Sequence, residues 1–293
     1  MSAATNRLAL GSAQFGLDYG IANVRGQVPP EAVAAILDDA RSHGMDTIDT
    51  AIAYGDAERR LGEAGIGWWK MVTKLPSIPG DCRNVGEWIT SSVEQSLLRL
   101  RIPCLHGLLL HNPLQLLESN GEKIYGALAG LKRDGLVEKT GISIYDSAEL
   151  DALVPRFPVD LVQAPFNILD RRLARSGWMK RLHEQGVELH VRSIFLQGLL
   201  LMGAAERDGR FGRWRSLWSR LETWLEHAGS TPLEACVGFA LSFPEIHRIV
   251  IGIDSLSQLR EIFSAAGSPV PVIPDDLFTD DLDLLNPARW AAS

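Results

Sequence analysis

The sequence predicts an α/β protein that folds as a single (β/α)8 TIM barrel, and three observations lead to this fold class. The chain has 293 residues, which suits one such barrel of roughly 250 residues or more. Apolar runs typical of strands alternate with amphipathic runs typical of helices along the chain. Most strand runs are continuously apolar, as in parallel strands buried on both faces. We therefore predict one domain over residues 1–293.

The elements follow in order from apolar runs, helical spacing and breaker residues. Val33, Ile36, Leu37 and Ala40 recur at helical spacing after Pro29 and Pro30, for example, and Gly44 ends that helix. The expected strands span 7–11, 46–51, 70–75, 107–111, 139–144, 161–166, 187–194 and 246–253. The expected helices span 30–41, 57–64, 84–101, 121–133, 147–157, 171–185, 213–227, 232–242 and 256–265. An open doubly wound sheet is the alternative, although no Gly-x-Gly-x-x-Gly turn follows the first strand.

Composition narrows the classes of function. The apolar content of 46% and charged content of 22% are those of a globular protein with a large core. A net charge of −7 argues against nucleic-acid binding, which needs a concentrated basic face. One basic cluster, residues 207–220, contains Trp214 and Trp218. It either binds a phosphate-bearing ligand or forms a solvated helix with inward tryptophans, and we favour the helix.

Cysteine usage and hydropathy bear on the compartment. Cys82, Cys104 and Cys236 are widely spaced and form no metal motif, which fits free thiols in a reducing compartment. The N-terminus lacks a signal-peptide pattern, and the longest apolar stretch, residues 194–205, is too short to span a bilayer. We expect a cytoplasmic protein without a metal ion and without membrane contact.

Polar residues at the strand ends outline a candidate site, because active sites of (β/α)8 barrels form at the carboxyl ends of the strands. These residues are Gln14, Asp49, Tyr54, Lys74, His111, Ser143, Gln163, Asn167, Arg192, Ser193, Asp254 and Ser255.

Four of these residues predict proton donation to an oxygen atom. A phenol has a pKa near ~10, and the ammonium of Lys74 would stabilise the phenolate of Tyr54 and lower that pKa. Asp49 would hold Lys74, and His111 would orient a carbonyl oxygen. Taken singly, each residue has an ordinary structural role, such as a solvated strand end or a loop hydrogen bond. Since no side chain supplies a hydride, the four together require a cofactor.

A set of short motifs spans nearly the whole chain. The motifs are Gly11-x-x-x-x-Gly16, Asp46-x-x-Asp49-Thr50-Ala51-x-x-Tyr54-Gly55, Thr73-Lys74, His111-Asn112-Pro113, Gly141-Ile142-Ser143, and Gln163 with Asn167. Together they resemble the motifs of the aldo-keto reductases, and most closely those of a bacterial branch of that family. The bacterial features are the segments Tyr19-Gly20-Ile21-Ala22-Asn23 and Arg192-Ser193-Ile194-Phe195-Leu196-Gln197-Gly198.

The resemblance implies roles for these residues. Asp49, Tyr54, Lys74 and His111 match the catalytic tetrad of the family. A nicotinamide cofactor is expected across the barrel mouth, with its carboxamide on Ser143 and Gln163, its pyrophosphate near residues 195–199 and its adenosine near residues 252–258. The expected cofactor contacts are Gln14, Ser143, Gln163, Arg192, Ser193, Phe195, Gln197, Gly198, Gly252, Asp254, Ser255 and Gln258.

Two positions depart from the family pattern. Ile144 stands where most members have Asn, and Arg192 stands where an aromatic ring commonly stacks on the nicotinamide. The positive charge of Arg192 would disfavour the oxidised, cationic nicotinamide. The resemblance favours NADPH, whereas Asp254 after the last strand, with Arg260 a helical turn or more away, leaves NADH open.

The resemblance further implies an NAD(P)H-dependent oxidoreductase that reduces a small aldehyde or ketone, with a sugar-derived carbonyl as one option. Residues 268–293 would form a C-terminal tail near the barrel mouth, where Tyr19 and Trp290 would contact the substrate; alternatively, Trp290 packs the tail onto the barrel wall. We expect a monomer or weak homo-oligomer. The alternatives are a catalytically weak, cofactor-binding regulatory subunit and a lyase or isomerase using Lys74 as a Schiff base, which Asp49 disfavours.

Overall fold

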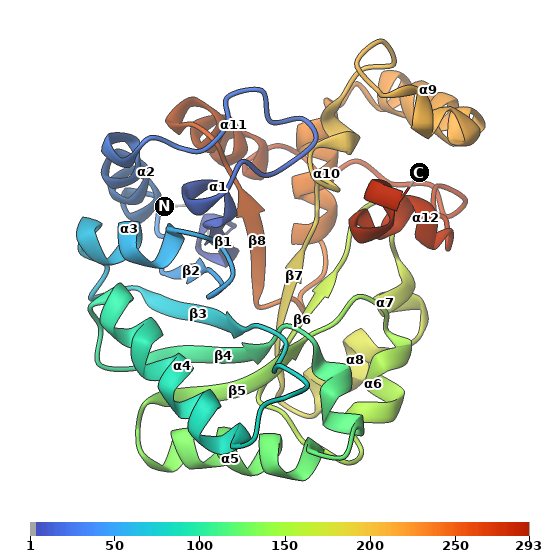
Figure 1. Ribbon diagram of the computed structural model, residues 1–293. Helices are drawn as coiled ribbons and strands as arrows, with labels where there is room; N and C mark the ends of the chain where they lie inside the picture. The colour runs from blue at the N-terminus through green and yellow to red at the C-terminus, as the bar shows by residue number, and fades with distance from the viewer. Residues whose placement is uncertain (1–3, 293) are drawn as a thin grey trace.

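Eight parallel strands close into a barrel in chain order in the computed structural model, which describes residues 4–292 (Figure 1). The last strand pairs with the first, with Ala9 opposite Val250. The strands are β1 (Leu8–Gly11), β2 (Thr47–Asp49), β3 (Lys70–Leu75), β4 (Leu105–Leu110), β5 (Val137–Ser143), β6 (Leu161–Pro165), β7 (Glu188–Arg192) and β8 (Arg248–Gly252). The predicted (β/α)8 barrel is confirmed, and the open doubly wound sheet is excluded.

Helices surround the barrel and agree with most of the expected ranges (Figure 1). They are α1 (Ala13–Gly16), α2 (Pro30–Ser42), α3 (Ala57–Ala64), α4 (Val85–Leu100), α5 (Gly121–Arg133), α6 (Ala148–Leu153), α7 (Arg172–Arg175), α8 (Trp178–Glu184), α9 (Arg215–Ala228), α10 (Pro232–Leu241), α11 (Leu256–Ala266) and α12 (Leu282–Leu285). Short 3-10 turns are η1 (Thr5–Arg7), η2 (Pro113–Leu117), η3 (Leu199–Leu201), η4 (Gly209–Trp214) and η5 (Pro287–Ala292).

The expected continuous helix over residues 171–185 is wrong. Gly177 has a φ of 80°, a left-handed conformation that ends α7 and starts α8. The expected loop after β1 also contains a short helix, α1. None of the helices within residues 4–292 has the length and apolar character needed to cross a bilayer.

Inside the barrel, a layer of polar side chains lies above a layer of apolar side chains. Val72, Leu109 and Leu161 form a buried cluster of their own. Because side chains two positions apart share a face of a strand, Lys74 lies beyond Val72 and Gln163 lies beyond Leu161, both towards the carboxyl ends. The polar groups at the barrel mouth therefore have a dry floor.

The C-terminal segment packs beside the end of β6. The backbone N–H of Thr279 donates to the carbonyl oxygen of Leu169, and Arg171 donates to the carbonyl oxygen of Leu277. Several arginines of the basic cluster pair with acidic side chains, among them Arg213 with Asp281 at 2.6 Å. These contacts, together with the burial of Trp218, support the interpretation of that cluster as a solvated helix with inward tryptophans.

Candidate active site

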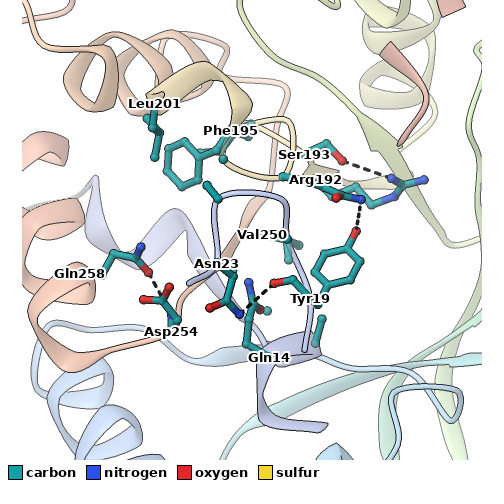
Figure 2. Close-up of a pocket in the computed structure, with 18 of the residues that line it drawn as sticks. Gln14, Tyr19, Asn23, Arg192, Ser193, Phe195, Leu201, Val250, Asp254 and Gln258 are labelled. Carbon is teal, nitrogen blue, oxygen red and sulfur yellow. Dashed lines mark hydrogen bonds between the residues drawn. The ribbon is translucent and has the colours of Figure 1, made fainter. Parts of the chain in front are cut away.

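A cavity of about 540 Å³ opens at the carboxyl ends of the strands (Figure 2). Active sites of this fold form at that face. The expected site residues that line it are Gln14, Tyr19, Asp49, Tyr54, Lys74, His111, Arg192, Ser193, Phe195, Gln197, Gly198, Gly252, Asp254 and Gln258.

The four residues of the expected acid–base cluster come together on one wall of this cavity. Lys74 Nζ lies 2.6 Å from Asp49 Oδ2 and donates to the carbonyl oxygen of Thr50 at 2.9 Å. The same ammonium lies 5.2 Å from the centroid of the Tyr54 ring. The ring of His111 meets that of Tyr54 edge-on, with centroids 6.3 Å apart. The ends of β2, β3 and β4 thus carry an ion pair, a phenol and an imidazole within one small volume.

His111 is neutral at physiological pH. Burial, followed by the charges of Lys74 and Arg192, lowers the pKa of its imidazole to about 4. A neutral imidazole donates one hydrogen bond and carries no readily transferable proton at pH 7. The proton-donating group of the cluster must therefore be sought elsewhere.

Ser143 and Gln163 lie beneath the cluster and do not line the cavity. Gln163 Nε2 donates to Asp49 Oδ1 at 2.6 Å, and Ser143 Oγ donates to Gln163 Oε1 at 3.3 Å. Both side chains are fully buried. In this structure they orient the carboxylate of Asp49, and the expected contact with a cofactor carboxamide stays a prediction. The amide of Gln163 is already engaged by Asp49.

The loop after β7 crosses towards the segment after β1. Ser193, Leu196 and Gln197 have positive φ angles, and a Cβ on Gly198 would lie 2.4 Å from Cβ of Ala22. Such backbone is uncommon outside glycine and is over-represented at ligand sites. The Gln197 amide donates to the hydroxyl of Tyr19 at 3.2 Å, so two loops meet over the cavity (Figure 2).

Arg192 lies at the end of β7 with its guanidinium over the ring of Tyr145, 4.6 Å from the ring centroid. It donates to the carbonyl oxygen of Ile144 at 2.9 Å and to Ser193 Oγ at 3.3 Å. Asn167 shapes the same region, because its amide donates to the carbonyl oxygen of Ser193.

The segment after β8 and the helix α11 present acidic groups to the cavity. Asp254 and Glu261 line it, whereas Arg260 forms an ion pair with Asp39 at 2.9 Å. Ser255 is not a lining residue, since its hydroxyl caps α11 by accepting from the N–H of Gln258.

Close packing at β1 and β8 leaves an unused acceptor in the cavity wall. A Cβ on Gly252 would lie 2.8 Å from Nε2 of Gln14, so a larger residue at this position would displace the Gln14 side chain. Oε1 of Gln14 is buried and has no hydrogen-bond partner among the described residues. A buried acceptor of this kind is normally satisfied, which indicates a ligand that donates a hydrogen bond here.

Trp290 does not line the cavity. Its ring packs edge-on against Phe211 at 5.1 Å, and its indole N–H donates to the carbonyl oxygen of Leu284. The tail therefore uses Trp290 for packing, the second of the two alternatives. Tyr19, in contrast, lines the cavity as expected.

Sequence reasoning missed several lining residues. Asn23 belongs to a motif that predicted no cavity contact for it, and Glu261 lies within α11. Tyr145 lies two residues beyond the carboxyl end of β5, and this position could have predicted that it lines the cavity. Thr231 and Leu233, at the start of α10, carry no sequence signal for a site.

Eight parallel strands, with this cavity at their carboxyl ends, define a (β/α)8 barrel whose site lies where enzymes of this fold carry theirs. A family model described as "Aldo/keto reductase family" matches residues 7–271. The chain belongs to the aldo-keto reductase family and is an oxidoreductase.

Several similar proteins come from bacteria. The oxidoreductase YqkF of Bacillus subtilis is 25% identical over 254 residues, which cover 80% of this chain and 82% of that protein. An aldo-keto reductase of Mycobacterium sp. strain KMS is 28% identical over 196 residues, which cover 63% of this chain and 68% of that protein. Among solved structures, the aldo-keto reductase AKR11C1 of Bacillus halodurans has a TM-score of 0.70 at 19% identity and covers 91% of this chain and 88% of its own. At 19% identity, the similarity to this last structure supports the fold alone.

Proposed function

We propose that the protein reduces an aldehyde or ketone to an alcohol with a nicotinamide cofactor, and that Tyr54 donates the proton. The observation that carries this proposal is the Asp49–Lys74–Tyr54–His111 cluster on the cavity wall. Family membership supports the same reaction class.

Each residue of the cluster has a distinct task in this proposal. The ammonium of Lys74, held by Asp49, stabilises negative charge on the oxygen of Tyr54 as its proton leaves. Neutral His111 donates a hydrogen bond to the carbonyl oxygen and polarises it. The nicotinamide supplies the hydride when bound. Lys74 is an unsuitable Schiff-base nucleophile because its ammonium is engaged by Asp49 and Thr50.

The residues present fit such a cofactor. The unsatisfied Oε1 of Gln14 suits an amide or ribose hydroxyl donor, and the positive-φ loop from Ser193 to Gly198 resembles a backbone cradle for phosphate oxygens. Gln14, Ser193 and Gly198 would hold the cofactor from opposite sides of the cavity.

We further propose NADH as the preferred cofactor, in place of the NADPH that family resemblance favours. Asp254 and Glu261 line the expected adenosine end, and carboxylates there suit a ribose 2′-hydroxyl and repel a 2′-phosphate. Arg260, the nearest candidate for a 2′-phosphate, is held by Asp39. Titration of both cofactors should give a lower dissociation constant for NADH than for NADPH. The double variant Asp254→Asn/Glu261→Gln should bring the two dissociation constants closer together. Tighter binding of NADPH by the wild type would refute this preference.

The test of the reaction compares wild type with Tyr54→Phe on a panel of aldehydes and ketones. Loss of the proton donor should lower kcat by ~10²–10⁴-fold without weakening cofactor binding. Tyr125→Phe is the matched control, because that hydroxyl donates to Pro158 on the surface. Turnover retained in Tyr54→Phe would exclude it as the acid. Cofactor binding without turnover of any carbonyl would instead support a regulatory subunit.

A further inference from the structure

The guanidinium of Arg192 is a cation on the cavity wall without an acidic partner in the part of the chain that the structure describes. Within residues 4–292, its recorded hydrogen bonds go to neutral acceptors, the carbonyl oxygen of Ile144 and the hydroxyl of Ser193. The other cation on this wall, Lys74, is neutralised by Asp49 at 2.6 Å. The charge of Arg192 therefore remains available to a ligand.

Arg192 is held in place before any ligand binds. Its guanidinium lies on the ring of Tyr145. The backbone of Tyr145 is in turn fixed at both ends: its N–H donates to Glu149 at 2.8 Å, and its carbonyl oxygen accepts from Arg172. Arg172 is anchored by two bonds to Asp170, at 2.9 and 2.8 Å. This preorganisation lowers the entropic cost of using the guanidinium to bind a ligand.

Chemistry indicates which group a positioned guanidinium binds. A guanidinium has five N–H donors in a planar fork, and Arg192 uses two of its nitrogens for the neutral acceptors. Its remaining donors suit the two oxygens of a carboxylate or of a phosphate. A partly buried cation is stabilised by an anion that enters with the ligand.

Arg192 also lies near the proposed reaction centre. It lines the same cavity as Tyr54 and His111, and its charge contributes to the lowered pKa of His111. A substrate whose carbonyl oxygen contacts Tyr54 would therefore occupy a cavity that Arg192 also lines.

We propose that Arg192 binds an oxyanion of the substrate, so that this enzyme prefers carbonyl compounds carrying a carboxylate or a phosphate. This inference rests on the proposed reduction of carbonyls and names the substrate class. In this proposal, Arg192 determines the preference of the enzyme for negatively charged substrates over neutral ones.

The experiment compares substrates that differ only in the anion. The pairs are 4-oxobutanoate with butanal, and glyceraldehyde 3-phosphate with glyceraldehyde. In the wild type, kcat/KM should be ~10–100-fold higher for at least one anionic member, the range expected for a hydrogen bond between charged groups. Arg192→Gln should reduce that ratio to near unity, and Arg192→Lys should retain part of it. Arg175→Gln is the matched control, an arginine that packs on the ring of Phe278 and does not line the cavity.

Succinate binding, measured by calorimetry on the cofactor-loaded protein, separates the two proposals. Succinate should bind the wild type at least ~10-fold more tightly than Arg192→Gln, even if no carbonyl on the panel is reduced. An anionic preference that survives in Arg192→Gln would overturn the assignment, and so would equal succinate binding together with no preference for either anionic substrate. Weaker cofactor binding in Arg192→Gln with an unchanged substrate ratio would mean that Arg192 holds a cofactor phosphate, which also overturns it.

Discussion

Replacing Lys74 with Met should destabilise the protein in a way that depends on pH. The ammonium lies 2.6 Å from Asp49, and the two side chains are 1% and 5% exposed. Lys74→Met keeps the length of the side chain and removes the charge. Asp49 then retains the hydrogen bond from Gln163 as its side-chain contact and becomes a buried carboxylate without a cation.

The size of the effect can be worked out from this geometry. At 2.6 Å and an effective dielectric constant of 20, the Coulomb attraction of the pair is about 6 kcal/mol. Removing one partner of a buried pair typically costs about 3–5 kcal/mol. Proton uptake by the stranded carboxylate sets an upper limit, because protonating an ordinary carboxylate costs about 4 kcal/mol at pH 7 and about 1.5 kcal/mol at pH 5. The expected loss is therefore about 3–4 kcal/mol at pH 7 and about half of that or less at pH 5.

Urea unfolding followed by tryptophan fluorescence at both pH values measures this loss. Lys70→Met is the matched control, because Lys70 begins the same strand and pairs with Asp46 at 2.8 Å in an exposed position. An exposed pair is worth less than about 1 kcal/mol. The double variant Lys74→Met/Asp49→Asn should recover most of the stability, since both charges are gone. A loss no larger than that of Lys70→Met, or one that does not change with pH, would refute the reasoning.

Three further predictions follow from the site and its surroundings. His111 contributes stability fully above pH 6.5, and that contribution should be lost as the pH falls through about 4, because burial and two nearby cations lower the pKa of its imidazole; His111→Asn should flatten this part of the stability profile in urea unfolding. Arg192→Tyr should raise affinity for the oxidised relative to the reduced cofactor by removing a positive charge, and an unchanged ratio of dissociation constants in fluorescence titrations would contradict this. Glu58→Gln should lower the free energy of unfolding by about 3 kcal/mol while leaving cofactor affinity unchanged, since Glu58 is 1% exposed, accepts from Thr73 and Arg99, and does not line the cavity.

The barrel could be predicted because its signal is local. Each strand is a short apolar run, such as Leu105–Leu110, and the breaker residues between runs separate strand from helix. Where prediction failed, the cause was backbone conformation at single residues. Gly177 divides the helix expected over residues 171–185, and the positive φ of Ser193 ends β7 earlier than its apolar run suggests.

Part of the candidate site was predictable for the same reason. Asp49, Lys74 and His111 stand at or just beyond the carboxyl ends of neighbouring strands, and the barrel brings those ends together. The positions of Gln163 and Trp290 were not predictable. A polar side chain near a strand end can either line the cavity or hydrogen-bond to a residue that lines it. The choice depends on its hydrogen-bond partners, and Gln163 donates to Asp49.

By itself, the sequence determined the fold class and the set of polar residues at the barrel mouth, including Asp49, Tyr54, Lys74 and His111, because strand order in a closed parallel barrel follows chain order. Tertiary structure alone decided the pairing of charges across the chain. Arg260 meets Asp39, which is distant in sequence, while Arg192 rests on Tyr145 without an acidic partner among the described residues. Hydropathy patterns encode which face of an element is buried, whereas ion pairs depend on long-range contacts that no local pattern records.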